Sequence, residues 1–238
     1  MSDSGSSVNA GEISTVRGFH DMVCGQKTAP IFRGEPKATF PLLPKIGRCY
    51  RYHSKYLDAP DTGRPFSLAD EVAAFKEFRQ RAMPYVNHVP RDDWEWLALA
   101  QHHGLPTRLL DWTENPLVAA FFACHDGHGS DAVIYVLDER QFNVPLYAES
   151  PFNITETKVF VPSHITPRIA AQGALFTIHP KPDEEFRSPH LQRWVIKESC
   201  LLEIWGMVEK YGVHHASLLP GLDGVAQYLR DRWFLYSE

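Results

Sequence analysis

The chain has 238 residues, of which 44% are hydrophobic, so it is long enough for one large domain with a full core. Its formal net charge of -5 excludes a global basic field, and a nucleic-acid partner would have to meet a local basic surface. The four cysteines are widely spaced and form no CxxC pair, which indicates a reduced, cytoplasmic protein. The sequence shows no signal peptide and no apolar run long enough to span a membrane, so we expect the protein to lie outside the membrane.

The N-terminal part of the chain predicts a tail followed by short elements. Residues 1–11 are rich in Ser, Gly and Asn, and we expect them to be disordered. A short amphipathic helix is expected within residues 13–24. Ile31-Phe32 then indicates a brief strand that ends at Arg33-Gly34. A helix is predicted over residues 67–83, with a serine at its N-cap and a proline just past its end.

Two helices with clear capping residues surround the most informative stretch of the chain. Asp92 can cap the first helix, and Gly104 can end it. Asn115 is a suitable N-cap for the second helix, with Pro116 at its first position. Residues 117–124 are apolar on every face, so we expect the second helix to be fully buried.

The remaining elements mix strands and helices without regular βαβ alternation. This order favours the α+β class, in a single domain with a mixed sheet and flanking helices. Strands are expected at 132–137, 158–162, 174–178 and 193–197, and helices at 199–211 and 222–233.

The extended run between the two central helices carries polar groups that a core strand would not favour. Arg108, Asp111 and Thr113 are costly to bury unless they are paired. They form either a structural hydrogen-bond network or the wall of a site. Arg108 and Asp111 pairing with each other is one structural alternative, and Thr113 helping to start the next helix is another.

Other chemical motifs are absent or weak. The chain has neither of the glycine-rich phosphate loops GxGxxG and GxxxxGK[ST], and no GxSxG. The pairs His102-His103 and His214-His215, and the HxxH spacing of His125 and His128, lack a completing carboxylate or cysteine set. We therefore expect polar loop histidines and no metal site.

Arg33 and Gly34 are a candidate ligand site of a different kind. An arginine offers a bidentate fork to phosphate, and a glycine lets a ligand approach the backbone. The alternative for Arg33 is a surface arginine beside a turn.

Several motifs resemble those of the FRG domain family, which is named for the tripeptide Phe-Arg-Gly. The resemblance implies that residues 12–238 form an FRG domain. Its motifs are FRG at 32–34, PLLP at 41–44, QHHGLPTRLLDWT at 101–113 followed by Asn115-Pro116, AQG at 171–173, and LPGLDG at 219–224.

A weaker resemblance links the chain to ADP-ribosyltransferases of the Arg-Ser-Glu type. Arg33-Gly34 is similar to their first element, and Asp111-Trp112-Thr113 before an Ala- and Phe-rich helix is similar to their second. Gln172 lies where their catalytic Glu opens a later strand. The resemblance implies an ADP-ribosyltransferase-like fold, catalytic roles for Arg33, Thr113 and Gln172, and NAD as co-substrate. The amide of Gln172 lacks the charge of a carboxylate and would stabilise the cationic transition state less well than Glu.

The alternative for Gln172 is a residue that satisfies backbone groups at a strand entrance.

These resemblances imply an NAD-dependent ADP-ribosyltransferase that releases nicotinamide and modifies a macromolecule, preferably DNA bases, as a toxin or defence effector. The expected partners are a nucleic acid and an antitoxin or reversing hydrolase. The alternative is a non-catalytic NAD- or nucleotide-sensing module that uses the same pocket. Expected cofactor-binding residues are Arg33, Gly34, Gln101, His102, Thr107, Arg108, Asp111 and Trp112; Arg48, Tyr50, Arg51 and Tyr52 are the expected substrate-binding residues.

Overall fold

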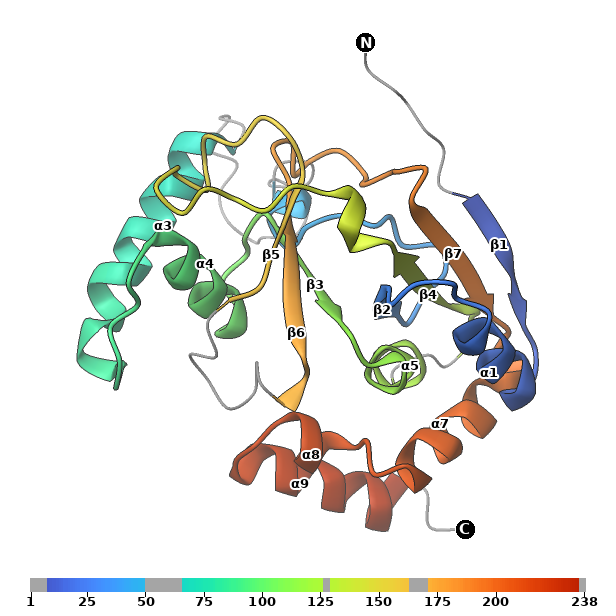
Figure 1. Ribbon diagram of the computed structural model, residues 1–238. Coiled ribbons are helices and arrows are strands. Elements are labelled where there is room, and N and C mark those ends of the chain that lie inside the picture. Colours follow the sequence, from blue (N-terminus) through green and yellow to red (C-terminus); the bar gives the residue numbers. More distant parts are fainter. Residues whose placement is uncertain (1–7, 50–65, 126–128, 163–170, 236–238) are drawn as a thin grey trace.

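The structure, a computed structural model, describes residues 8–49, 66–125, 129–162 and 171–235. Seven strands form one mixed sheet in the order β1-β7-β4-β2-β3-β6-β5, and helices cover it, which confirms the α+β class (Figure 1). All neighbouring strands are antiparallel except β1 and β7, which are parallel. The strands are β1 (Val8–Ile13), β2 (Ile31–Glu35), β3 (Leu109–Thr113), β4 (Ala132–Leu137), β5 (Lys158–Phe160), β6 (Ala174–Ile178) and β7 (Leu191–Ile196).

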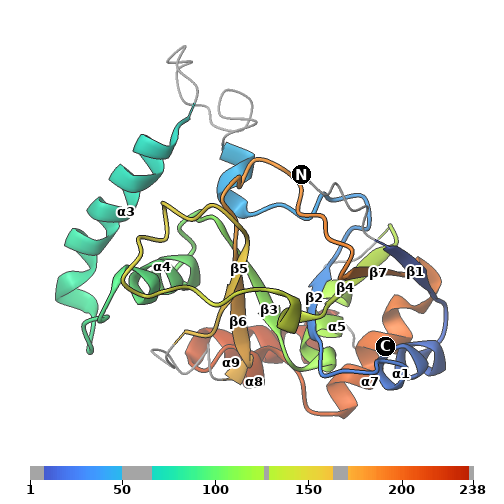
Figure 2. The ribbon, with the colours of Figure 1, turned by 45° about the horizontal axis from the view of Figure 1, so that its top comes forward.

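Some helices lie at the two ends of the sheet, whereas α5 packs on the central strand β2 (Figure 1). In both views α3 and α4 lie at the β5–β6 end, whereas α1 and α7 lie at the β1–β7 end (Figures 1 and 2). No helix in the described part of the chain is long and apolar enough to cross a membrane. The helices are α1 (Val16–Cys24), α3 (Leu68–Ala82), α4 (Asp93–His102), α5 (Pro116–Cys124), α7 (Leu201–Lys210), α8 (His215–Leu218) and α9 (Leu222–Arg230), and a π-helical turn follows at Asp231–Leu235.

The capping residues predicted around the central stretch are confirmed. The Asp92 carboxylate accepts from the backbone N–H groups of Trp94 and Glu95, and Asn115 accepts from Leu117. These bonds satisfy N–H groups that have no partner within the helix. The sequence therefore places the start of α4 and of α5 on either side of β3.

Two of the expected boundaries are wrong. The N-terminal tail does not extend to residue 11, because Val8–Ile13 pairs with β7 as the edge strand β1. The brief strand does not end at Arg33-Gly34 either. Both residues lie inside β2, which continues to Glu35 and pairs with β4 along its whole length.

Three groups of buried side chains hold the layers together. One joins α1, α5 and α7 to the central strands, and a second joins α3 and α4 to β3, β5 and β6. The third lies on the other side of β2, β3 and β4, beneath loops that contain Leu42 and Phe186. The four cysteines are free thiols, two of them buried.

A buried polar chain runs through the third group. The Trp112 indole N–H donates to Thr177 Oγ1 at 2.9 Å, and Thr177 Oγ1 lies 2.8 Å from His179 Nε2. The threonine hydroxyl accepts from tryptophan, so donating its own proton to an unprotonated Nε2 satisfies both neighbours. Burial, with smaller contributions from Arg33 and Arg108, lowers the pKa of His179 to about 3.

His179 is therefore expected to make the protein less stable in mild acid. Its unfolded pKa is 6.5, so between pH 6.5 and pH 3 the unfolded chain binds the extra proton and the stability contribution is lost as pH falls. The expected slope is about 1.4 kcal/mol per pH unit. Urea unfolding at pH 7 and pH 5 should show a smaller loss in a His179→Gln variant, which keeps a hydrogen-bond acceptor. Equal losses in both proteins would contradict this account.

Candidate functional site

One pocket of about 360 Å³ collects most of the predicted site residues. It lies between β2, β3 and α5, beside the entrance to β6. Its wall contains eight of the residues predicted from the sequence: Arg33, Gly34, Gln101, His102, Asp111, Trp112, Thr113 and Gln172.

The pocket lies where the sheet opens between β2 and β3. These two strands pair only at Phe32 and Thr113, whereas β2 pairs with β4 over its full length. The Arg33 side chain crosses the opening, and its Nη1 donates to the backbone oxygen of Asp111 at 2.8 Å. Arg33 thus links two strands whose backbones have separated.

Arg33 is held by two carboxylates. Its Nε and Nη2 donate to Oε1 of Glu35 at 3.0 and 2.5 Å, and its Nη1 lies 3.6 Å from Oδ2 of Asp111. Burial would lower the pKa of Arg33, but Glu35 and Asp111 outweigh that effect and raise it above its usual value. The guanidinium is permanently charged and fixed in place, so the alternative of a surface arginine beside a turn is wrong.

Glu35 is the site residue that the sequence analysis missed. Arg33 and Glu35 are alternate residues of one strand and therefore share a face. The i, i+2 spacing of the two opposite charges could have indicated an ion pair. That spacing places both side chains on one face only in a strand, and the expected strand ended at Gly34. Glu35 supplies the carboxylate that the predicted set of Arg33, Thr113 and Gln172 lacks.

Gln101 and Thr107 position the Asp111 side chain. Gln101 Nε2 donates to Asp111 Oδ2 at 3.0 Å, and Gln101 Oε1 accepts from Thr107 Oγ1 at 2.6 Å. Thr107 is buried outside the pocket wall, so its expected contact with a cofactor is wrong. It orients a residue that does line the pocket.

Arg108 also lies outside the pocket. Its Nε and Nη2 donate to the two carboxylate oxygens of Glu71 on α3 at 2.8 and 2.7 Å, and both side chains are 3% exposed. The expected cofactor contact is therefore wrong, and so is the alternative pairing with Asp111. A bidentate, buried pair of this kind attaches α3 to β3, because either charge alone would be costly to bury.

Thr113 and Gln172 contact each other, but their side chains form hydrogen bonds to backbone groups. Thr113 Oγ1 donates to the backbone oxygen of Gln172 at 2.7 Å and accepts from Asn115 N–H at 3.0 Å. Gln172 Nε2 donates to the backbone oxygen of Leu218 at 3.1 Å. The structural alternatives for both residues thus have direct support: they join the start of α5, the entrance to β6 and the end of α8.

Gly34 permits a close approach of backbone, but the approaching group is a helix. A Cβ atom built on Gly34 would lie 1.9 Å from the backbone oxygen of Ala119 and 2.7 Å from the nitrogen of Ala123. The expectation that this glycine admits a ligand is therefore corrected. It admits α5, whose packing on β2 forms one side of the pocket.

Aromatic side chains form part of the wall. Phe122 is 39% exposed on the pocket side of α5, so the prediction of a fully buried helix is wrong at this position. Trp112 is nearly fully buried and its indole donates to Thr177, so its side chain belongs to the core rather than to a cofactor contact. The exposed Phe122 ring is available to a ligand.

The predicted substrate-binding cluster is described only in part. Arg48 is exposed, lies 5.8 Å from the centre of the Phe40 ring and does not line the pocket. Tyr50, Arg51 and Tyr52 lie outside the described residues. Their contact with a substrate stays a prediction.

Two of the predicted loop histidines are not polar loop residues. His215 is the first residue of α8 and its side chain is buried, and His125 follows directly after α5. Both rings point at the buried carboxylate of Asp231. His128 lies outside the described residues.

A family model matches the part of the chain that builds the pocket. Residues 28–132 match the FRG domain, and this span contains β2, β3, α4 and α5. The later motifs at 171–173 and 219–224 lie outside the matched span. No curated protein and no solved structure gives a significant match. Residues 28–132 are therefore similar to the FRG domain family, and they supply most of the pocket wall.

Proposed function

We propose that the pocket binds the nicotinamide-ribose end of NAD and that the protein is an NAD-dependent ADP-ribosyltransferase. The observation that carries this proposal is the charge of the pocket, where one guanidinium faces two carboxylates, those of Glu35 and Asp111. The nicotinamide-ribose group is cationic, and positive charge moves onto the ribose C1′ as its glycosidic bond breaks. A fixed negative environment stabilises such a transition state.

The size and lining of the pocket fit half of a dinucleotide. Its volume of about 360 Å³ lies near the lower end of the range of roughly 300–1,000 Å³ for ligand sites. The exposed Phe122 ring offers a stacking surface for nicotinamide. Arg33 is already bound to two carboxylates, so we assign it to positioning Glu35 rather than to holding the pyrophosphate, which would extend out of the pocket.

We assign separate catalytic roles to Glu35 and Asp111. Glu35, paired with Arg33, stabilises positive charge at C1′ while nicotinamide leaves with the electrons of the broken C–N bond. The acceptor then forms a bond to C1′ and loses a proton. Asp111, whose side chain is 55% exposed, is the carboxylate placed to take that proton near the mouth of the pocket.

We propose a macromolecular acceptor, with DNA bases preferred, and a role as a toxin or defence effector. The test is nicotinamide release from NAD by the purified protein, with DNA, RNA and cell lysate offered separately. Intact mass of the acceptor should rise by one ADP-ribose. Arg33→Ala should abolish release, whereas Arg17→Ala, at an exposed position of α1, should not change it.

A non-catalytic NAD-sensing module is the second candidate. The bonds that occupy Thr113 and Gln172 favour it, because two of the three residues expected to act in catalysis are committed to the local fold. NAD binding that depends on Arg33 without nicotinamide release would support this module over the transferase. Neither binding nor release would overturn both.

A further inference from the structure

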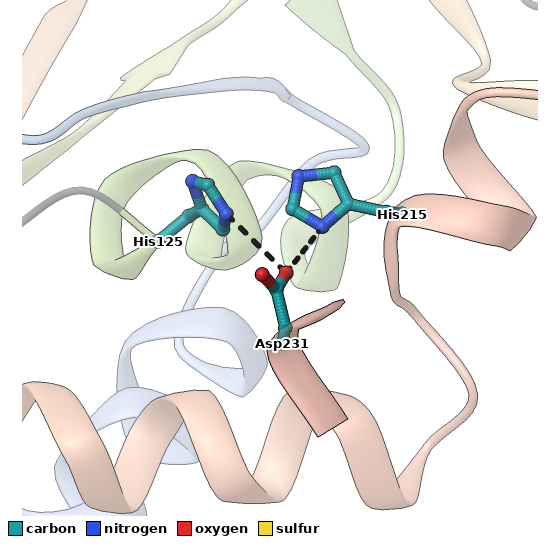
Figure 3. A group of neighbouring side chains, drawn as sticks. All are labelled: His125, His215 and Asp231. Atoms are coloured by element: carbon teal, nitrogen blue, oxygen red, sulfur yellow. Dashed lines mark ion pairs between the residues drawn. The ribbon is translucent and has the colours of Figure 1, made fainter. Parts of the chain in front are cut away.

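A second group of converging side chains lies at the C-terminal end of α5. His125 follows the last residue of α5, His215 opens α8, and Asp231 follows α9 (Figure 3). One ligand atom from each, an imidazole nitrogen or a carboxylate oxygen, lies within 4.8 Å of the other two. Residues 125 and 231 are more than a hundred positions apart, so only the fold brings them together.

The distances between these atoms suit a small cation. Asp231 Oδ2 lies 2.8 Å from His215 Nδ1 and 3.6 Å from His125 Nε2. The ligands of a tetrahedral zinc ion lie about 3.3 Å apart, since each is about 2.0–2.1 Å from the metal. The distances from Asp231 Oδ2 to the two imidazole nitrogens therefore lie within about 0.5 Å of that separation.

Two of the three atoms are fully buried. His215 Nδ1 and Asp231 Oδ2 lie 2.8 Å apart, and neither has another hydrogen-bond partner among the described residues. Buried polar atoms need partners, and a metal ion that receives a lone pair from each can serve both atoms in place of their contact with each other.

The surroundings orient these side chains. The other oxygen of Asp231, Oδ1, accepts from Nε and Nη2 of Arg230 at 3.1 and 2.9 Å, which fixes the carboxylate and leaves Oδ2 for the centre of the group. The Phe121 ring stacks on His125 and lies edge-on to His215. Such an outer shell of a hydrogen bond and apolar rings holds the ligands of metal sites in place.

We propose that His125, His215 and Asp231 bind one divalent transition-metal ion such as Zn²⁺. Two imidazoles and one carboxylate favour a transition metal over Mg²⁺ or Ca²⁺, which prefer oxygen ligands. His125 is partly exposed, so solvent can supply the fourth ligand. The ion joins the end of α5, within the FRG span, to the C-terminal helices outside it. This proposal departs from the expectation of no metal site.

The test titrates the chelator-treated full chain with Zn²⁺ in competition with a chromogenic chelator. We expect one tight site per chain, and at least about tenfold weaker binding in His215→Ala and in the nearly isosteric Asp231→Asn. His214→Asn is the matched control. The neighbouring His214 caps α8 by accepting from Ser217 N–H, and asparagine keeps that cap. This variant should bind as the wild type does, and Mg²⁺ should not compete.

Co²⁺ provides a second, spectroscopic readout. Its visible absorption should report nitrogen and oxygen ligands at one site in the wild type, and the bands should disappear in Asp231→Asn. Zinc should also raise the melting temperature of the wild type but not of Asp231→Asn. A wild type without a tight site, or equal binding by wild type and Asp231→Asn, would overturn the proposal and leave a buried ion pair.

Discussion

Replacing Gly34 with alanine is expected to cost about 3 kcal/mol or more of the free energy of unfolding, a large share of the total stability. The added Cβ would lie 1.9 Å from the backbone oxygen of Ala119. Backbone cannot move aside as a flexible side chain can, so α5 would have to separate from β2. Overpacking in a core typically costs 1–3 kcal/mol, and a backbone overlap exceeds that case. Native domains have only about 5–15 kcal/mol to lose.

The matched control is Gly206→Ala in the middle of α7. A Cβ at Gly206 meets nothing within 4 Å, so the variant should be as stable as the wild type or more so by up to about 1 kcal/mol, because alanine favours helix. Urea unfolding followed by circular dichroism measures both. A Gly34→Ala protein within about 1 kcal/mol of the wild type would show that α5 does not pack on β2 as described.

Replacing Glu35 with glutamine is expected to lower nicotinamide release by about 100-fold or more, if the proposed transferase is correct. Glutamine keeps the shape and one acceptor oxygen but removes the charge that faces the developing cation. Loss of one such fixed electrostatic group typically costs 10²–10³ in rate. Asp111→Asn, at a more exposed carboxylate, should have a smaller effect. The KM for NAD should change little, because the charge matters most in the transition state.

Two measurements separate this result from damage to the fold. Glu35→Gln weakens the ion pair with Arg33, so about 1–3 kcal/mol of stability will be lost, and the melting temperature must still exceed the assay temperature. Glu12→Gln, on β1 far from the pocket lining, is the control carboxylate and should keep full activity. Full activity in Glu35→Gln would show that Glu35 does not stabilise the transition state and would leave Asp111 as the carboxylate to test.

The local parts of the fold were predictable from the sequence, because capping is a short-range effect. Asp92 and Asn115 mark the starts of α4 and α5 by accepting from backbone N–H groups two or three residues away, and Pro116 occupies the first position of α5. The buried strand at 132–137 is similarly evident from its β-branched residues. These elements place β3 and α5, and thus two walls of the pocket.

The pairings that complete the site were not predictable, because they join distant parts of the chain. Arg108 forms an ion pair with Glu71 on α3, and no feature of the sequence near Arg108 predicts that partner. Similarly, Asp231 lies near His125 and His215 only in the folded protein, and no local pattern in the sequence indicates that they meet. Glu35 was missed for a different reason: a polar Arg-Gly-Glu run does not look like a strand until β4 is known to pair with it.

The parallel pairing of β1 with β7 has a consequence for how the protein is made. Strand β1 pairs with β7, which comes much later along the chain, so neither β1 nor the open edge of β4 has its partner until residues 191–196 have been synthesised. Every residue of β4 is buried in the finished protein, and in the nascent chain that apolar edge can pair with other chains. The time between translation of β4 and of β7 is therefore when a growing chain is most exposed to aggregation, and when a chaperone would help it most.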